Sequence, residues 1–145
     1  MNDTIIRRLK PEDAAEISRI SASITRAHNK TDFKRVAEKQ TQTEGDASFV
    51  AERGDRLVGY CISYILSGSF GMEKSAWVAM LGVDPEFMGQ GIGEMLAGET
   101  LKNYKALGIR DIYTSVRWDS TDLLSFFKTL GFQRSDFINL HKSLE

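Results

Sequence analysis

Hydrophobic and polar residues follow two periods along the chain, and each period predicts its own kind of element. Residues 4–9, TIIRRL, predict a short first strand. Apolar residues at spacings of three and four then predict an amphipathic helix that begins at Pro11, which suits the first helical position. The apolar face of this helix carries three isoleucines: Ile17, Ile20 and Ile24. A second helix is expected to follow, with Thr31 as its cap.

The middle of the chain has the pattern of strands. Residues 47–52 and 57–66 are apolar runs separated by the turn sequence Arg-Gly-Asp-Arg, and together they predict a β-hairpin. Residues 77–83 form another apolar run without charge, short enough for a buried strand and too short to span a membrane. Pro85 ends this run because proline has no N–H to donate to a sheet. Three antiparallel strands are therefore expected before Pro85.

The second half predicts a helix, a fifth strand and another helix. The first of these helices is expected to run to about Ala106, with Gly108 as the glycine that follows its end. A strand is expected at residues 109–116, so that the unit beginning at residue 77 is a crossover with parallel strands. The core residues expected in the crossover helix are Met95, Leu96, Leu101 and Leu107.

The chain is expected to end with a helix and further strands. Asp119 or Ser120 can cap the helix. Its apolar residues are Leu123, Leu124, Phe126, Phe127 and Leu130. After Gly131 the chain is expected to turn into final strands, whose apolar residues are Phe137, Ile138 and Leu140.

Three glycines between the strand at residues 77–83 and the following helix predict an anion site. Gly89, Gly91 and Gly93 alternate just before the helix, whose first N–H groups lack partners and carry partial positive charge. A Walker-type loop would need Gly-Lys-Ser/Thr here, and a dinucleotide fingerprint would need glycine in place of Glu94. A turn without a ligand is the alternative, but three glycines at period two exceed what a turn needs.

Residues 83–96, VDPEFMGQGIGEML, resemble motif A of the GNAT family, the acetyl-CoA-dependent N-acetyltransferases. In that family a Gln/Arg-x-x-Gly-x-Gly/Ala turn follows the fourth strand and wraps the pyrophosphate of CoA. Gly91 and Gly93 stand at the two small positions, and Met88 stands where Gln or Arg is usual. The opening strand and helix and the Leu-Gly-Phe sequence at residues 130–132 also resemble the family, so the resemblance covers essentially the whole chain.

The resemblance implies an α/β fold with a mixed sheet, arranged as a single GNAT domain over residues 1–145. A central, mostly antiparallel sheet would contain a parallel, splayed pair made by its fourth and fifth strands, with about four helices around it. The implied function is acetyl transfer from acetyl-CoA, the co-substrate, to a primary amine by direct attack, without a metal. The residues expected to bind the coenzyme are Leu81, Val83, Met88, Gly89, Gln90, Gly91, Ile92, Gly93, Glu94, Ser120 and Phe127.

Two positions that carry catalytic groups in some relatives hold aromatic residues in this chain. Phe127 occupies the position of a tyrosine that often protonates the leaving thiolate in the family. Trp77 occupies the position of a glutamate that serves some relatives as a general base. Glu73 is a candidate base acting through water, although a solvated loop carboxylate is the simpler interpretation. The alternative to an enzyme is therefore a CoA- or acyl-CoA-binding module with little or no catalysis. A domain that binds ATP or NAD is a third possibility.

Composition and charge narrow the class of protein. A length of 145 residues suits one domain with a sizeable core, and a net charge of −1 gives no basic surface for nucleic acid. The single cysteine, Cys61, is expected in the core and fits a reducing compartment. The N-terminus has no long apolar stretch, so a cytoplasmic protein without a membrane partner is expected. His28 could touch the amine acceptor, which is unknown, and a homodimer is expected by analogy alone.

Overall fold

The computed structural model describes residues 3–25, 31–42, 46–68, 71 and 73–145. These residues form two compact units, Met1–Thr114 and Ser115–Glu145, and each is considered by itself. The single domain expected over residues 1–145 stays a prediction. His28 lies outside the described residues, and so does any contact that it would make with an acceptor.

A five-stranded sheet with strand order β1-β2-β3-β4-β5 forms the centre of the first unit. The strands are β1 (Thr4–Arg8), β2 (Phe49–Arg53), β3 (Arg56–Ser67), β4 (Lys74–Val83) and β5 (Ile112–Thr114). The first four strands pair antiparallel, and β5 pairs parallel to β4. This confirms the mixed sheet, although β5 is shorter than the expected strand at residues 109–116.

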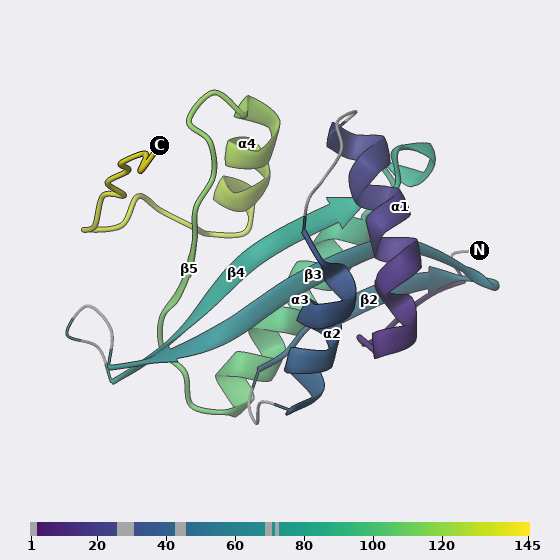
Figure 1. Ribbon diagram of the computed structural model, residues 1–145, viewed down its shortest axis with the longest axis horizontal. Coiled ribbons are helices and arrows are strands. Elements are labelled where there is room, and N and C mark those ends of the chain that lie inside the picture. The colour runs from purple at the N-terminus through teal and green to yellow at the C-terminus, as the bar shows by residue number, and fades with distance from the viewer. Residues whose placement is uncertain (1–2, 26–30, 43–45, 69–70, 72) are drawn as a thin grey trace. The chain divides into compact units, whose positions relative to one another are not determined.

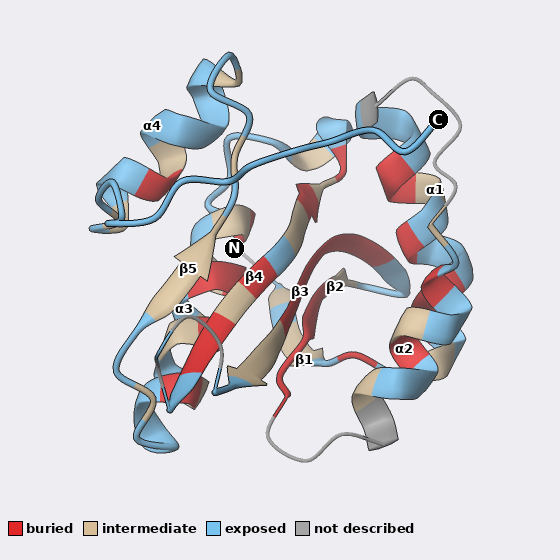
Figure 2. Cartoon of the chain, turned by 60° about the vertical axis from the view of Figure 1, so that its left-hand side comes forward, coloured by how far each residue is buried: buried red, intermediate tan, exposed pale blue. Residues whose placement is uncertain are grey.

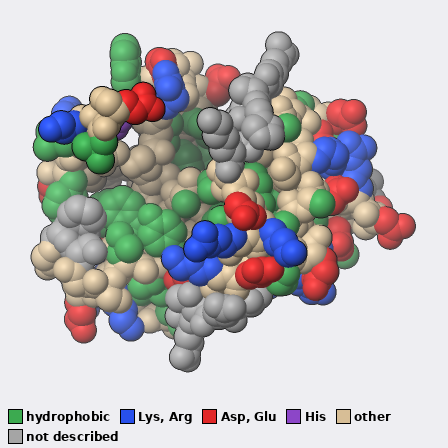
Figure 3. All heavy atoms as spheres, in the orientation of Figure 1, with side chains coloured by type: hydrophobic (Ala, Val, Ile, Leu, Met, Phe, Trp, Pro, Cys, Tyr) green, Lys and Arg blue, Asp and Glu red, His purple; other side chains and the backbone are tan. Residues whose placement is uncertain are grey.

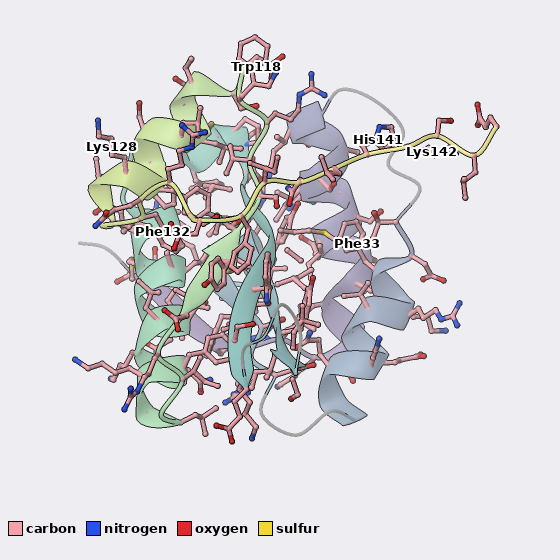
Figure 4. All side chains as sticks on the ribbon, turned by 90° about the vertical axis from the view of Figure 1, so that its left-hand side faces the viewer. Phe33, Trp118, Lys128, Phe132, His141 and Lys142 are labelled. Atoms are coloured by element: carbon pink, nitrogen blue, oxygen red, sulfur yellow. The ribbon has the colours of Figure 1, made fainter. Side chains whose placement is uncertain are left out.

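Helices cover both faces of this sheet (Figure 1). On one face lie a 3-10 turn η1 (Pro11–Asp13), α1 (Ala14–Thr25) and α2 (Phe33–Gln42), and on the other lies α3 (Ile92–Ala106). Figure 4 views the sheet nearly edge-on, with Phe33 on the side of α1 and α2. The cap of α2 is Asp32, whose Oδ1 accepts from the N–H of Arg35 at 3.1 Å, and not Thr31 as expected.

Two apolar clusters fill the space between these layers, and the buried residues run along β2, β3 and β4 (Figure 2). Beneath α1 and α2 the cluster consists of Leu9, Ala14, Ile17, Ile20, Phe33, Ala37, Val50, Leu57, Tyr60 and Ile62. Beneath α3 it consists of Ala47, Phe49, Ala51, Val58, Cys61, Ala76, Val78, Ile92, Leu96 and Tyr104. Of the three isoleucines expected on α1, Ile24 is 43% exposed and lies outside the core.

The buried stripe of α3 differs from the one expected. Ile92, Leu96, Thr100 and Tyr104 recur at every fourth position and are fully buried. Leu107, expected in the core, is 54% exposed because it stands at the C-cap, where the helix ends. The stripe was not predicted in full because Thr100 and Tyr104 carry polar groups. The Tyr104 hydroxyl can be buried because it accepts from the Ala47 N–H at 3.1 Å and forms a hydrogen bond with Ser63 Oγ at 2.8 Å.

The end of α3 confirms the predicted stop. Gly108 has φ of +79°, a left-handed conformation that glycine adopts without a Cβ penalty. Its N–H donates to the carbonyl of Lys105, and the N–H of Ile109 donates to the carbonyl of Tyr104. This pair of bonds is a Schellman motif, which satisfies two of the helix's last carbonyls.

The second unit contains α4 (Thr121–Thr129), whose N-cap is Ser120. Asp119 pairs with Arg117 at 3.1 Å instead of capping the helix. Among the described residues 133–145 the chain forms neither helix nor strand, so the final strands that we expected are wrong. The apolar residues expected in those strands stand among charged and polar ones and are exposed: Phe137 by 43%, Ile138 by 74% and Leu140 by 89%. Of these residues only Ile138 and Leu140 have the alternate spacing of one strand face, and two apolar residues are too few to bury such a face.

Candidate functional site

Strand β4 continues five residues beyond its pairing with β5. The last parallel pair is Val78 with Thr114, and the Thr114 hydroxyl donates to the Val78 carbonyl at 2.9 Å. Immediately afterwards the β3–β4 register shifts by one residue, which leaves the exposed Ala79 as a β-bulge. From there to Val83 the edge of β4 that faced β5 has no strand beside it in the described part of the chain.

The register shows which backbone groups lie on this free edge. Ser63 turns its backbone towards β2, because its N–H donates to a hydroxyl at the start of that strand at 3.1 Å. Directions alternate along an antiparallel strand, so Cys61 and Gly59 also turn towards β2. Their partners on β4 are Leu81 and Val83, which therefore turn their N–H and C=O groups away from β3. These are two of the residues that the sequence analysis expected to bind the coenzyme.

The free edge leads into the glycine turn at the start of α3. Gly89 and Gly91 have φ of +81° and +78°, and Gly91 is the N-cap of the helix. Within the described chain, no backbone acceptor takes the N–H groups of residues 89–94. Open space lies where a Cβ on either glycine would project. The turn therefore presents several N–H groups at the positive end of a 15-residue helix, which is an arrangement that binds phosphate.

Predicted site residues of the turn play different parts. The side chain of Ile92 is 1% exposed and packs in the core beneath α3, so only its backbone N–H can face a ligand. Met88 is 67% exposed and leaves the turn open on its side. Gln90 and Glu94 are exposed, and the carboxylate of Glu94 stands in the first turn of α3. The structure brings these residues together, while their contact with a coenzyme stays a prediction.

The β2–β3 hairpin braces the turn through a residue that sequence reasoning missed. Arg53 donates a hydrogen bond from Nη1 to the Oε1 atom of Gln90. Its guanidinium carbon also lies 5.4 Å from the centre of the Phe87 ring, in the 3-10 turn η3 (Pro85–Phe87). Arg53 and Gln90 are 37 residues apart in sequence, and no local pattern indicates their contact.

A buried carboxylate anchors the other side of the turn. Asp84 is 3% exposed, and its side chain accepts from the Glu86 N–H at 3.0 Å, from Arg19 at 3.2 Å and from Arg56 at 3.1 Å. Burial by itself would raise the pKa of Asp84, but the hydrogen bonds from Glu86 and Arg19 and the charge of Arg56 outweigh burial and lower it. The ionised carboxylate thus joins η3 to α1 and to the hairpin.

The remaining predicted residues do not belong to the turn itself. Glu73 is exposed before β4, and at 3.3 Å per residue it lies roughly 17 Å along the chain from Val78, where the parallel ladder ends. Ser120 and Phe127 belong to the second unit. Phe127 is 6% exposed there and packs edge-on against Phe126 and Phe132, at centroid distances of 5.3 and 5.1 Å.

Trp77, the other aromatic residue at a family catalytic position, is half-buried on β4. Its ring stacks on Tyr113 of β5, with centroids 4.8 Å apart and planes 23° from parallel. Its indole N–H donates to Ser75 Oγ at 2.9 Å. The ring is therefore held in one orientation by two contacts.

The described residues lack both a metal-binding cluster and a membrane-spanning helix. They contain no group of three or more His, Cys, Asp or Glu side chains placed to hold a metal ion. They also contain no helix that is both long and apolar enough to cross a membrane.

A mixed sheet whose fourth strand runs past its parallel neighbour into a glycine turn and helix start is the arrangement that the resemblance to the GNAT family implied. The model of the Acetyltransferase (GNAT) family matches residues 14–132, and the chain belongs to that family. The resemblance seen in the sequence is thereby confirmed, and so is the predicted fold.

Individual relatives agree with this assignment. Over 105 residues the chain is 30% identical to a mycothiol acetyltransferase of Amycolatopsis mediterranei (strain U-32), a match that covers 70% of this chain and 35% of that protein. The chain thus spans about a third of the length of the mycothiol acetyltransferases that it matches.

Solved structures show the same fold at lower identity. An aminoglycoside acetyltransferase from an uncultured soil metagenomic sample, in complex with trehalose, has a TM-score of 0.82 at 21% identity. That similarity covers 99% of this chain and 98% of the other. An aminoglycoside N-acetyltransferase in complex with CoA has a TM-score of 0.81 at 15% identity, over 97% and 95% of the two chains.

Proposed function

We propose that this chain transfers an acetyl group from acetyl-CoA to a primary amine. One observation carries the proposal: the free edge of β4 at Leu81 and Val83 leads directly into the N–H groups of the turn at residues 89–94. The pantetheine arm of CoA contains amides, which need hydrogen-bonding partners such as an unpaired strand edge offers. The diphosphate of CoA needs N–H donors and positive charge, which the start of α3 offers.

The arrangement of the residues supports binding at one end and reaction at the other. With the diphosphate at the turn, the arm would run along β4 towards the closed end of the free edge, which is the Val78–Thr114 pair. Acetyl-CoA brings an acetyl group activated as a thioester. Overall, the amine nitrogen forms a bond to the carbonyl carbon, the C–S bond breaks, sulfur keeps the electron pair as thiolate, and the ammonium proton passes to solvent.

The chain's contribution to this reaction is mainly positioning. Phe127 has no hydroxyl with which to protonate the thiolate, but a thiolate is a tolerable leaving group at neutral pH. Holding the thioester and the amine together lowers the barrier because the two reactants no longer have to meet in solution. An enzyme without the tyrosine can therefore still accelerate the reaction.

The test combines binding and turnover. Acetyl-CoA is titrated into the full chain by calorimetry, and CoA release is followed over a panel of primary amines. We expect saturable binding together with amine-dependent release of CoA. Absence of acetyl-CoA binding to the folded chain would contradict the proposal.

The second candidate is a CoA- or acyl-CoA-binding module, which is favoured by the presence of Phe127 and Trp77 at the two positions that are catalytic in relatives. Such a module would bind acetyl-CoA in the same calorimetric titration but would turn over no amine. The CoA-release assay therefore separates the two candidates. Higher turnover in a Phe127→Tyr variant would show that the enzyme is limited by the missing acid.

We also propose a reducing compartment such as the cytoplasm, and a homodimer. The first is supported by Cys61, a free thiol buried in the core. The second is supported by analogy with other GNAT proteins alone, and sedimentation velocity of the purified chain tests it.

A further inference from the structure

Three aromatic residues form a row across neighbouring strands of the sheet. In the ladder registers, Tyr64 of β3 is the partner of Trp77 of β4, and Trp77 is the partner of Tyr113 of β5. Directly paired residues project from the same face of a sheet, so the three side chains stand side by side. We call these three residues the aromatic row.

The aromatic row lies on the face of the sheet opposite to α3. Ser63 and Val78, the neighbours of Tyr64 and Trp77, point towards α3: Ser63 bonds the Tyr104 hydroxyl, and Val78 packs in the cluster beneath that helix. Successive residues of a strand point to opposite faces, so the aromatic row points to the side of α1 and α2. On that side, hydrophobic side chains gather over β5 and the adjoining part of β4 (Figure 3).

The row is ordered and partly open. All three side chains are half-buried, so each keeps part of its surface exposed. The stacking of Trp77 on Tyr113 and the bond from the Trp77 indole to Ser75 fix the central ring before any ligand arrives. A ligand that contacts these rings does not have to order them, which reduces the entropic cost of its binding.

The position of the row connects it with the proposed reaction. Trp77 and Tyr113 form the pair that directly precedes Val78 and Thr114, where the free edge of β4 closes. The glycine turn lies at the opposite end of that edge. The inference rests on the proposed function: an acyl group that reaches the closed end of the edge would be next to the aromatic row.

We propose that the aromatic row binds the ring of the acceptor and that the acceptor is an arylalkylamine. A planar aromatic ring packs against Trp and Tyr by stacking or edge-to-face contact, whereas a short alkyl chain has less surface to bury against them. The row carries no charge of its own, so it offers nothing that selects for a polycation. An aryl ring held at the row would leave an amine on a short linker free to reach the end of the β4 edge.

The experiment compares two amines that differ in the ring, 2-phenylethylamine and n-butylamine. For the full chain we expect kcat/KM to be at least tenfold higher for 2-phenylethylamine. Trp77→Leu and Tyr113→Leu should each reduce this ratio at least fivefold and leave the KM for acetyl-CoA within twofold. Two variants are used because either one alone could fail to fold. Trp118→Phe is the matched control, since Trp118 is 87% exposed and projects from the segment before α4 (Figure 4).

A second readout does not depend on turnover. The chain has two tryptophans, so the Trp118→Phe variant reports the fluorescence of Trp77 alone. Titration with 2-phenylethylamine should change this fluorescence saturably, and n-butylamine at equal concentration should not.

The outcomes separate this inference from the proposed function. Equal kcat/KM for the two amines, or an unchanged ratio in both leucine variants, would overturn the aromatic row as the acceptor site while acetyl transfer stands. If neither amine is turned over, the fluorescence titration decides: a saturable change supports the row, and no change overturns it. Loss of acetyl-CoA binding in calorimetry would instead count against the proposed function.

Discussion

Asp84 is a buried charged side chain, and aspartate is rarely buried in proteins unless it is paired. Its carboxylate accepts from Arg19 on α1, from Arg56 on the hairpin and from the N–H of Glu86 in η3. Removing one partner of a buried ionic network leaves the others without compensation, which costs more than an exposed pair would. The conformation of the segment that leads into the glycine turn therefore depends on this carboxylate.

Asp84→Asn should lower the free energy of unfolding by about 1–3 kcal/mol at pH 7, since a charged acceptor of three hydrogen bonds becomes a neutral amide. Folding lowers the pKa of Asp84, so its ionised form stabilises the fold above the unfolded pKa of about 4. This stabilisation is lost as the pH falls through the lower folded pKa. Urea unfolding at pH 7 and pH 3 should show a difference between variant and wild type that shrinks at pH 3.

Asp119→Asn is the control for this experiment. Its pairing with Arg117 also lowers the pKa of Asp119, but the pair is fully exposed, and such pairs contribute little to stability. Unfolding of this variant should match the wild type at both pH values. An equal effect of the two substitutions would show that burial of Asp84 has no special role.

At the scale of elements, the β2–β3 hairpin and the glycine turn act as one unit. Arg53 reaches from the hairpin to Gln90 in the turn, and both Arg53 and Arg56 lie 5.4 Å from the Phe87 ring centre. The glycines of the turn would by themselves allow it many conformations. The brace reduces this freedom before a ligand binds, which favours binding.

Arg53→Met should raise the KM for acetyl-CoA about fivefold with kcat unchanged, because a lost hydrogen bond of about 1 kcal/mol loosens the turn without touching the reacting groups. Arg53→Lys keeps the positive charge but loses the planar guanidinium. It should therefore show a similar increase in KM. A wild-type KM in Arg53→Lys would mean that charge attraction, and not the brace, is what matters.

Elements whose patterns are local could be predicted from the sequence. The hairpin, the crossover from β4 to β5 and the end of α3 at Gly108 were confirmed, because apolar runs and turn residues determine them within a few positions. The stripe of α3 was only partly predicted, since Thr100 and Tyr104 carry polar groups. The Thr100 hydroxyl donates to the Leu96 carbonyl of its own helix at 2.9 Å, whereas the Tyr104 hydroxyl finds its partner Ser63 on another element.

Contacts across the fold could not be predicted in this way. The bulge at Ala79, which places Leu81 and Val83 on the free edge, depends on the pairing of two strands and leaves no mark in the composition of β4. The brace from Arg53 to Gln90 likewise depends on tertiary packing. The glycine turn forms where the sequence predicts it because its pattern is local, and the binding role of its residues stays a prediction. The residues that support the turn were missed.

For the molecule as a whole, the reactivity of the single thiol, Cys61, measures how often the core of the first unit opens. Cys61 is 1% exposed, and burial raises the pKa of its thiol to about 11. Both facts make the folded thiol unreactive at pH 8. Its labelling should therefore proceed only through unfolding.

Binding of acetyl-CoA should slow this labelling. A ligand at about one hundred times its Kd stabilises the folded state by about 2.7 kcal/mol, which corresponds to roughly 100-fold slower labelling when opening is in rapid equilibrium. Mass spectrometry after N-ethylmaleimide treatment, with and without acetyl-CoA, measures the effect. Rapid labelling of the native chain would show that Cys61 does not lie in a closed core.

The proposed function requires the N–H groups at the start of α3 to hold the diphosphate of CoA, and two glycines that flank this helix allow a test. Gly91 and Gly108 have φ of +78° and +79°, and both have open space where a Cβ would project. Alanine therefore introduces the same backbone strain, roughly 1–2 kcal/mol, at opposite ends of α3.

Calorimetric titration of acetyl-CoA into the wild type, Gly91→Ala and Gly108→Ala is the measurement. We expect Gly91→Ala to lose at least tenfold in affinity, and Gly108→Ala to bind within twofold of the wild type. Equal affinity in all three proteins, or an equal loss in both variants, would contradict the claim.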